Sequence, residues 1–169
     1  MITEPAVRTA IVNIIQTAAP NAKVWRRYVR PPGGQQSDFD AIFRGLDRTI
    51  HVYFIRRVQR VPTVNGTAGR LVKVTHTYAI AASRAVKNTG YQFAATADTQ
   101  ASEELFQAEI EAIGAAFETT PFDLGFGIGA GVAATGLQMP SDFTDKMVGN
   151  IFCHCAALRV SVITSNIPT

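Results

Sequence analysis

The residues best suited to chemistry in this chain stand together as Cys153-His154-Cys155. Thiolate and imidazole are ligands that zinc prefers, and a closed structural zinc site uses four of them. Residues two apart on a strand point to the same face, so His154 would point away from both sulfurs. His51 and His76 are the only other histidines. We therefore predict no metal site and no cofactor, with two free thiols rather than a strained disulfide between near neighbours.

Glycines alternate at positions 125, 127, 129 and 131 in the segment GFGIGAG, which superficially resembles a phosphate-binding loop. The spacing matches neither G-x-x-x-x-G-K-[ST] nor G-x-G-x-x-G, and no lysine follows it. The segment also follows a predicted helix rather than a strand. We interpret residues 121–140 as a Gly-rich loop that orders against a partner.

Carboxylates and hydroxyls are the remaining candidates for catalysis. Paired acids can act as general acid and base, but acids at helical spacing more often form a solvated or partner-facing surface. No serine stands in a nucleophile motif such as G-x-S-x-G. We therefore predict no catalytic residue and no enzyme activity. The candidates for an acidic partner face are Glu103, Glu104, Glu109 and Glu111.

Charge is divided by position along the chain. Residues 1–97 hold 14 basic residues against 4 acids, a net charge of +10, whereas residues 98–169 hold 2 against 9, a net charge of −7. Such a chain can meet a polyanion, or identical copies can meet through unlike faces. Arginine pairs with phosphates and carboxylates alike, so both hypotheses stay open. The basic candidates for a subunit interface or a DNA channel are Arg26, Arg27, Arg30, Arg44, Arg48, Arg56, Arg57 and Arg60.

The elements that would position these residues can be predicted from periodicity. A chain of 169 residues with 47% hydrophobic residues suits one domain over residues 1–169 with its own core. We expect first a helix that is capped by Thr3 and ends near Pro20, then a strand at 23–30 and a loop at 31–49 that starts with PPGGQQSD. Two strands should follow at 50–58 and 70–82, joined by a connection at 59–69. The rest of the chain should form a helix at 98–118, the Gly-rich loop, a helical turn from Ser141 to Met147, and a strand at 150–164.

Phe106, Ile110, Ile113 and Phe117 should form the buried stripe of the second helix, because they recur at spacings of four, three and four. The element order predicts an α+β fold: a mostly antiparallel sheet of about four strands with two main helices packed on one side. We find no signal peptide and no apolar run of the roughly 18–20 residues that a membrane span needs. We therefore expect synthesis in the cytoplasm and no membrane partner.

The layout resembles the tail terminator, or tail completion, proteins of long-tailed bacteriophages. The resemblance covers nearly the whole chain as a pattern: an amphipathic N-terminal helix, a hairpin ending in RLVKVTHTYAIAA, a helix SEELFQAEIEAIGAAF, a Gly-rich loop and a final strand FCHCAALRVSVIT. It implies a non-enzymatic virion protein that forms a ring, usually a hexamer. The ring would cap the tail tube, stop its growth and join the head connector, with DNA passing through its centre.

Two alternatives remain beside this one. The first is a head–tail connector or another neck protein of similar size. The second is a sheet-based nucleic-acid-binding module, favoured by the basic N-terminal part and by aromatic residues that could stack on bases, although Tyr78 lies on an apolar face. These aromatic residues are Trp25, Tyr28, Tyr53 and Tyr78.

Overall fold

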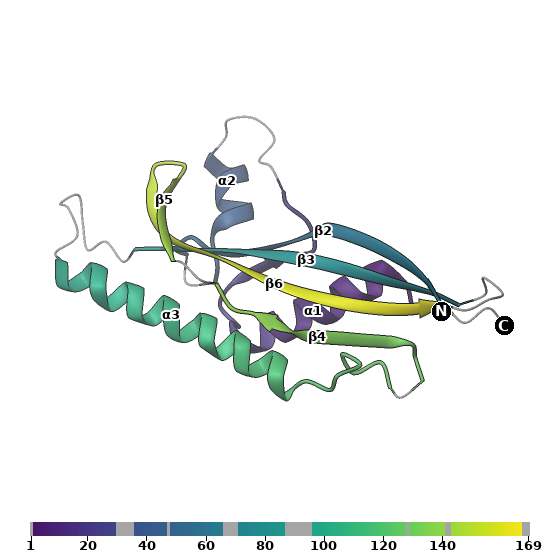
Figure 1. The fold of residues 1–169 in the computed structure, drawn as a ribbon. Coiled ribbons are helices and arrows are strands. Elements are labelled where there is room, and N and C mark those ends of the chain that lie inside the picture. Colours follow the sequence, from purple (N-terminus) through teal and green to yellow (C-terminus); the bar gives the residue numbers. More distant parts are fainter. Residues whose placement is uncertain are drawn as a thin grey trace.

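The computed structural model describes residues 2–29, 36–46, 48–65, 71–86, 96–127, 129–140 and 143–166. Arg30, residues 66–69 of the expected connection and Ser141 of the expected helical turn lie outside these residues. In chain order the elements are α1 (Glu4–Ala18), β1 (Lys23–Trp25), α2 (Gln36–Phe43), β2 (His51–Asn65), β3 (Leu71–Ala85), α3 (Thr96–Thr119), β4 (Val132–Gln138), β5 (Thr144–Val148) and β6 (Ile151–Asn166), as shown in Figure 1.

The strands form one mixed sheet of six strands in the order β1-β2-β3-β6-β4, and β5 pairs with the other end of β6. β1 runs parallel to β2, and the other pairings are antiparallel. The prediction of about four mostly antiparallel strands with two helices was therefore wrong. Parallel neighbours need a crossover connection, and the segment that contains α2 supplies it between β1 and β2.

The remaining differences lie in segments that we predicted as loops or, for β5, as a helical turn. α2 begins at Gln36, within the expected loop 31–49, and β2 continues to Asn65 through the expected connection. β4 lies inside the Gly-rich segment, and β5 replaces the expected helical turn. β4 pairs with residues of β6 that lie 21 to 32 positions later in the chain, whereas β5 forms a hairpin with the start of β6, in which Val148 pairs with Ile151.

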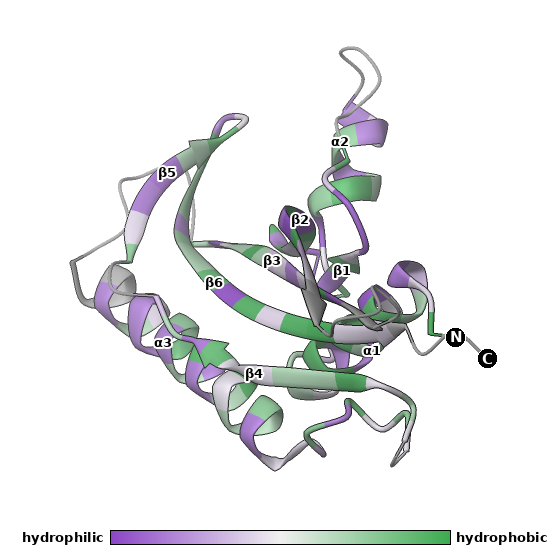
Figure 2. Cartoon of the chain, turned by 45° about the vertical axis from the view of Figure 1, so that its right-hand side comes forward, coloured by the Kyte–Doolittle hydropathy of each residue, from purple (hydrophilic) through white to green (hydrophobic). Residues whose placement is uncertain are grey.

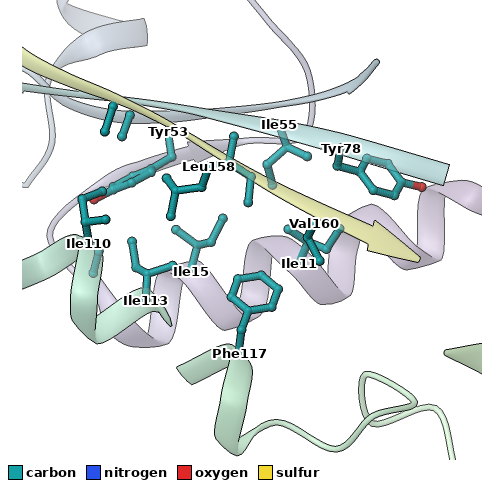
Figure 3. Close-up of a cluster of buried hydrophobic side chains, with 14 of the residues drawn as sticks. Ile11, Ile15, Tyr53, Ile55, Tyr78, Ile110, Ile113, Phe117, Leu158 and Val160 are labelled. Carbon is teal, nitrogen blue, oxygen red and sulfur yellow. The ribbon is translucent and has the colours of Figure 1, made fainter. Parts of the chain in front are cut away.

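The main hydrophobic core lies between one face of the sheet and the helices α1 and α3. Figure 3 shows Tyr53, Ile55 and Tyr78 of the sheet above Ile110 of α3 and Ile15 of α1. The predicted stripe of α3 is confirmed, since each of its four members is buried. Every second residue of β3 from Val74 to Ala82 is buried on this face, and Tyr53 and Ile55 of β2 join the same core before the register shift between Arg57 and Gln59.

A second, smaller core lies on the opposite face, where α2 packs against the start of β2. Ile42 and Phe43 of α2 contact a group that includes Val52 and Phe54, and Phe43 meets the ring of Phe54 edge-on. The expectation that the helices pack on one side holds for α1 and α3 and fails for α2. Figure 1 shows α2 and β5 on one side of the sheet, with α1 and α3 on the other.

Candidate functional site

A row of polar residues crosses the face of the sheet that α3 covers. His51 of β2 pairs with Arg84 of β3, which pairs with His154 of β6, which pairs with Asp145 of β5. Both histidines are only 2% exposed. Each of the four therefore stands beside the next on adjacent strands. From α3, which packs on this face, Ser102 contacts His154 and Glu109 contacts His51.

Glu109 is the centre of the first half of this row. Its Oε1 accepts hydrogen bonds from Nε2 of His51, at 2.7 Å, and from the hydroxyl of Tyr53, while its Oε2 lies 3.1 Å from Nη1 of Arg84. Burial pushes the pKa of Glu109 up, but hydrogen bonds from His51 and Tyr53 and the positive charges beside it outweigh burial, so the net pKa is lowered. The same burial, with the charge of Glu109, raises the pKa of Tyr53. Glu109 is therefore an ionised carboxylate that joins α3 to β2 and β3.

Ser102, His154 and Asp145 form the second half of the row. The hydroxyl of Ser102 lies 2.8 Å from Nε2 of His154, and Nδ1 of His154 lies 2.7 Å from Oδ1 of Asp145. An ionised Asp145 accepts from Nδ1–H, which leaves Nε2 to accept the Ser102 hydroxyl. This is the hydrogen-bond order of a Ser-His-Asp catalytic triad.

The surroundings of Ser102 favour a structural role for these three residues. Ser102 is only 6% exposed, so a substrate carbonyl has no path to its hydroxyl in this conformation. It lies inside α3, where the helix already uses its backbone N–H, so that group cannot stabilise an oxyanion. The ring of Phe106 also stacks on His154, with centroids 6.1 Å apart. The three residues tie α3 to β6 and β5.

This polar row was not predicted from the sequence. His51 and Glu109 are 58 positions apart, and Ser102 and His154 are 52 apart. Only the alternation of β2 and β6 carried a hint, because it places the polar His51 and His154 on faces whose neighbours are apolar.

The predicted basic residues do not gather in one place. Arg26 and Arg27 are exposed and line an open pocket of about 400 Å³ between α1 and β1, together with Glu4 and Arg8. Arg57 lies 4.0 Å from Glu4, at the limit of an ion pair. These residues therefore form a mixed-charge group near the start of α1.

The other predicted arginines lie on β2 and between α2 and β2. Arg44, the residue after α2, pairs at 2.7 Å with Asp40 of that helix and holds the pKa of that carboxyl below its usual value. Arg48 is exposed, with a left-handed φ of 61°. Arg56 and Arg60 are exposed on β2, and Arg30 lies outside the described residues.

The predicted acidic residues separate into two sets. Glu109 turns inward, as described above, while Glu103 bonds to Gln107 on the same helix. Glu104 and Glu111 are exposed, and the part of the chain that the structure describes offers neither of them an ion-pair partner. We define the outer face of α3 by the exposed side chains Ala101, Glu104, Leu105, Ala108, Glu111, Ala112, Ala115 and Glu118.

The sheet has an uncovered area on the side away from α3. We define this open face by alternate residues of β3 from Lys73 to Ala81, alternate residues of β6 from Ala157 to Ser165, and Arg56 of β2. α2 covers the same side only near the start of β2. Figure 1 shows α2 and β5 over one end of the sheet, while β3 and β6 continue past them, and the turned view in Figure 2 shows both elements on the side of the sheet away from α3. Among the described residues, no helix covers the open face.

The aromatic residues that favoured nucleic-acid binding are mostly out of reach. Tyr53 and Tyr78 are at most 1% exposed. The indole N–H of Trp25 donates to the carbonyl of Ile42, and only Tyr28 is largely exposed. The sheet therefore offers no stacking platform built from these four residues.

The described residues hold no group of three or more His, Cys, Asp or Glu placed to bind a metal ion. His154 belongs to the face under α3, and Cys153 belongs to the opposite face, which confirms the predicted alternation. Of the described helices, none has the length and hydropathy of a membrane span. In comparisons with known proteins, neither a family model nor a curated protein sequence matches this chain.

Proposed function

We propose that this protein is a structural virion protein without enzyme activity. Its copies form a ring, as a hexamer, at the head-proximal end of a bacteriophage tail tube. The ring ends tail growth, joins the head connector and lets DNA pass through its centre. The protein is made in the host cytoplasm and resides in the tail or neck of the virion.

One observation carries this proposal: two unlike surfaces lie on opposite sides of the same subunit. The outer face of α3 carries glutamates and small apolar side chains, whereas the open face carries Arg56, Lys73 and Arg159. A contact between two different patches of identical subunits generates a ring when its rotation closes. The choice of a tail ring among possible rings rests on the sequence resemblance.

The buried polar row supports a scaffold rather than an enzyme. Glu109 and the two histidines bond between α3 and the sheet, and Asp145, whose side chain is 46% exposed, bonds to His154 from β5, so these groups hold elements together. The burial of Tyr53 and Tyr78 makes a nucleic-acid-binding sheet the weaker alternative.

The test is light scattering after size-exclusion chromatography at low and high salt, followed by negative-stain imaging with and without purified tail tubes that lack their terminator. We expect closed rings near six times 18.2 kDa, alone or at one end of each tube, and fewer rings in solution at high salt. A protein that forms no ring in solution and does not bind tube ends would refute the proposal. Binding to the head connector alone would transfer the assignment to the neck.

A further inference from the structure

The open face has the shape of a surface that receives a helix. Its middle consists of small side chains, among them Thr77, Ala79 and Ala81 of β3 and Ala157 of β6. The side chains of β3 from Thr75 to Ala81 on this face are small, so a second backbone can approach this strand between the flanking Arg56 and Arg159. Between Lys73 and Ala81 this strip is about 26 Å long, from a rise of roughly 3.3 Å per strand residue.

The outer face of α3 has the matching shape. Ala101, Ala108 and Ala115 recur every seven residues, so they form one row along the helix. Leu105 beside this row is 57% exposed. From residue 101 to residue 118 the face is about 26 Å long, at roughly 1.5 Å per helical residue. A helix with a small apolar row can approach a sheet closely.

Charge identifies the occupant of the open face. Arg56 and Arg159 both pair with Ala79, so their guanidinium groups flank one row of the sheet, and Lys73 lies six residues further along β3, about 20 Å away. Glu104 and Glu118 are fourteen residues apart on one side of α3, which is about 21 Å. The described part of the open face contains no acid, and the described outer face of α3 contains no base.

We propose that the outer face of α3 in one copy packs along β3 on the open face of the next copy. One terminal glutamate then lies between Arg56 and Arg159, and the other lies at Lys73. The two surfaces are on opposite sides of the subunit. Each copy therefore presents the outer face of α3 to one neighbour and the open face to the other, so the copies associate head to tail. This inference rests on the proposed ring and identifies its subunit contact.

Cysteine cross-linking tests the contact directly. Ala108→Cys lies on the outer face of α3, and Ala157→Cys lies on the open face; both positions are exposed. Since they lie on opposite sides of one subunit, a short bismaleimide between them must join different copies. We expect the double variant to give a ladder of dimers, trimers and higher species. A matched pair, Ala108→Cys with Thr17→Cys on α1, should give no ladder, and the parent protein measures the background from Cys155.

Charge reversal tests the ionic pairing with the same readout. In the double-cysteine background, Glu104→Arg with Glu118→Arg should lower the ladder yield at least about tenfold, as should Arg56→Glu with Arg159→Glu. Those four changes together with Lys73→Glu should restore the yield to within about threefold, because the two glutamates and all three basic residues that they face then carry reversed charge. Arg26→Glu with Arg27→Glu, two exposed arginines outside both surfaces, should leave the yield within about threefold of its starting value.

The outcomes separate this contact from the ring itself. If the protein forms rings but gives no cross-linked ladder, or if charge reversal leaves the ladder unchanged, the proposed contact is overturned and the proposed ring is not. A ladder that reversal abolishes and the combined variant restores, in a protein that forms open filaments, would support the contact and overturn the ring. The absence of both ladder and rings would overturn both.

Discussion

Replacing Glu109 by alanine should destabilise the protein strongly, because Glu109 is the acceptor at the centre of a buried group. The substitution removes the acceptor used by Tyr53 and His51, which are 1% and 2% exposed. A buried polar group that loses its partner costs about 1–3 kcal/mol. Arg84 is 24% exposed, so after the substitution its guanidinium group can bond to water and adds little to the loss of stability. We therefore expect a loss of about 3–5 kcal/mol in the free energy of unfolding.

Urea denaturation measures this loss as a fall in the midpoint at constant slope. In a chain of this size the same loss corresponds to a fall in Tm of about 6–20 °C. Glu104→Ala is the matched control, because Glu104 lies on the same helix but is exposed and should change the stability by less than about 0.5 kcal/mol. A double-mutant cycle with Tyr53→Phe should give a coupling of about 0.5–3 kcal/mol.

The pH dependence provides an independent check on the same carboxylate. The pKa of Glu109 is lowered below its ordinary value of 4.5, so the native state binds fewer protons than the unfolded state in acid. The stabilisation that ionised Glu109 gives the native state is fully present above pH 4.5, and it is lost as the pH falls from 4.5 through the lowered pKa. The difference in the free energy of unfolding between the parent protein and Glu109→Ala should therefore decrease as the pH falls over this interval. Equal stabilities of Glu109→Ala and Glu104→Ala at pH 7 would refute the argument that the buried group stabilises the fold.

Three further predictions follow from burial. Phe106→Ala should cost about 3–5 kcal/mol in urea denaturation while Leu105→Ala, at the exposed neighbouring position, costs less than about 0.5; equal effects would show that α3 is rotated from its described orientation. Iodoacetamide should label the half-buried Cys155 before Cys153 in native protein, because burial raises the pKa of Cys153 to about 12, and mass spectrometry of peptides would expose the opposite order. Burial and then the nearby arginines lower the pKa of His76, so the free energy of unfolding should fall as the pH drops below about 6.5. His76→Gln should flatten this dependence of stability on pH, and an unchanged dependence would contradict its assignment to His76.

Periodicity in the sequence was sufficient for the elements whose side chains repeat toward one core. The stripe of Phe106, Ile110, Ile113 and Phe117 predicted the buried face of α3, because helical spacing alone places these residues together. Alternation along β2 and β3 likewise predicted their faces. These signals are local, so neighbouring residues carry them without knowledge of the fold.

The failed predictions concern elements with weak local patterns, whether the pairing partner is distant, as for β4, or adjacent in the chain, as for β5 in its hairpin with β6. β4, with the sequence VAATGLQ, and β5, with TDKMV, have weak strand patterns and pair at opposite ends of β6. α2 follows a Pro- and Gly-rich segment and packs its short apolar side on residues of β2. Their stability comes from pairing and packing across the sheet, which a local pattern does not contain.

The sequence by itself determined the two long helices, the faces of the central strands, and the division of charge between a basic and an acidic part. Tertiary structure alone decided which charges meet: it buries Glu109 against Arg84, brings Ser102, His154 and Asp145 together, and leaves Glu104 and Arg159 exposed on opposite sides. The physical reason is that hydrophobic periodicity acts between neighbours in the chain, whereas a buried polar contact forms only where sheet register and helix packing place two distant side chains within hydrogen-bond reach.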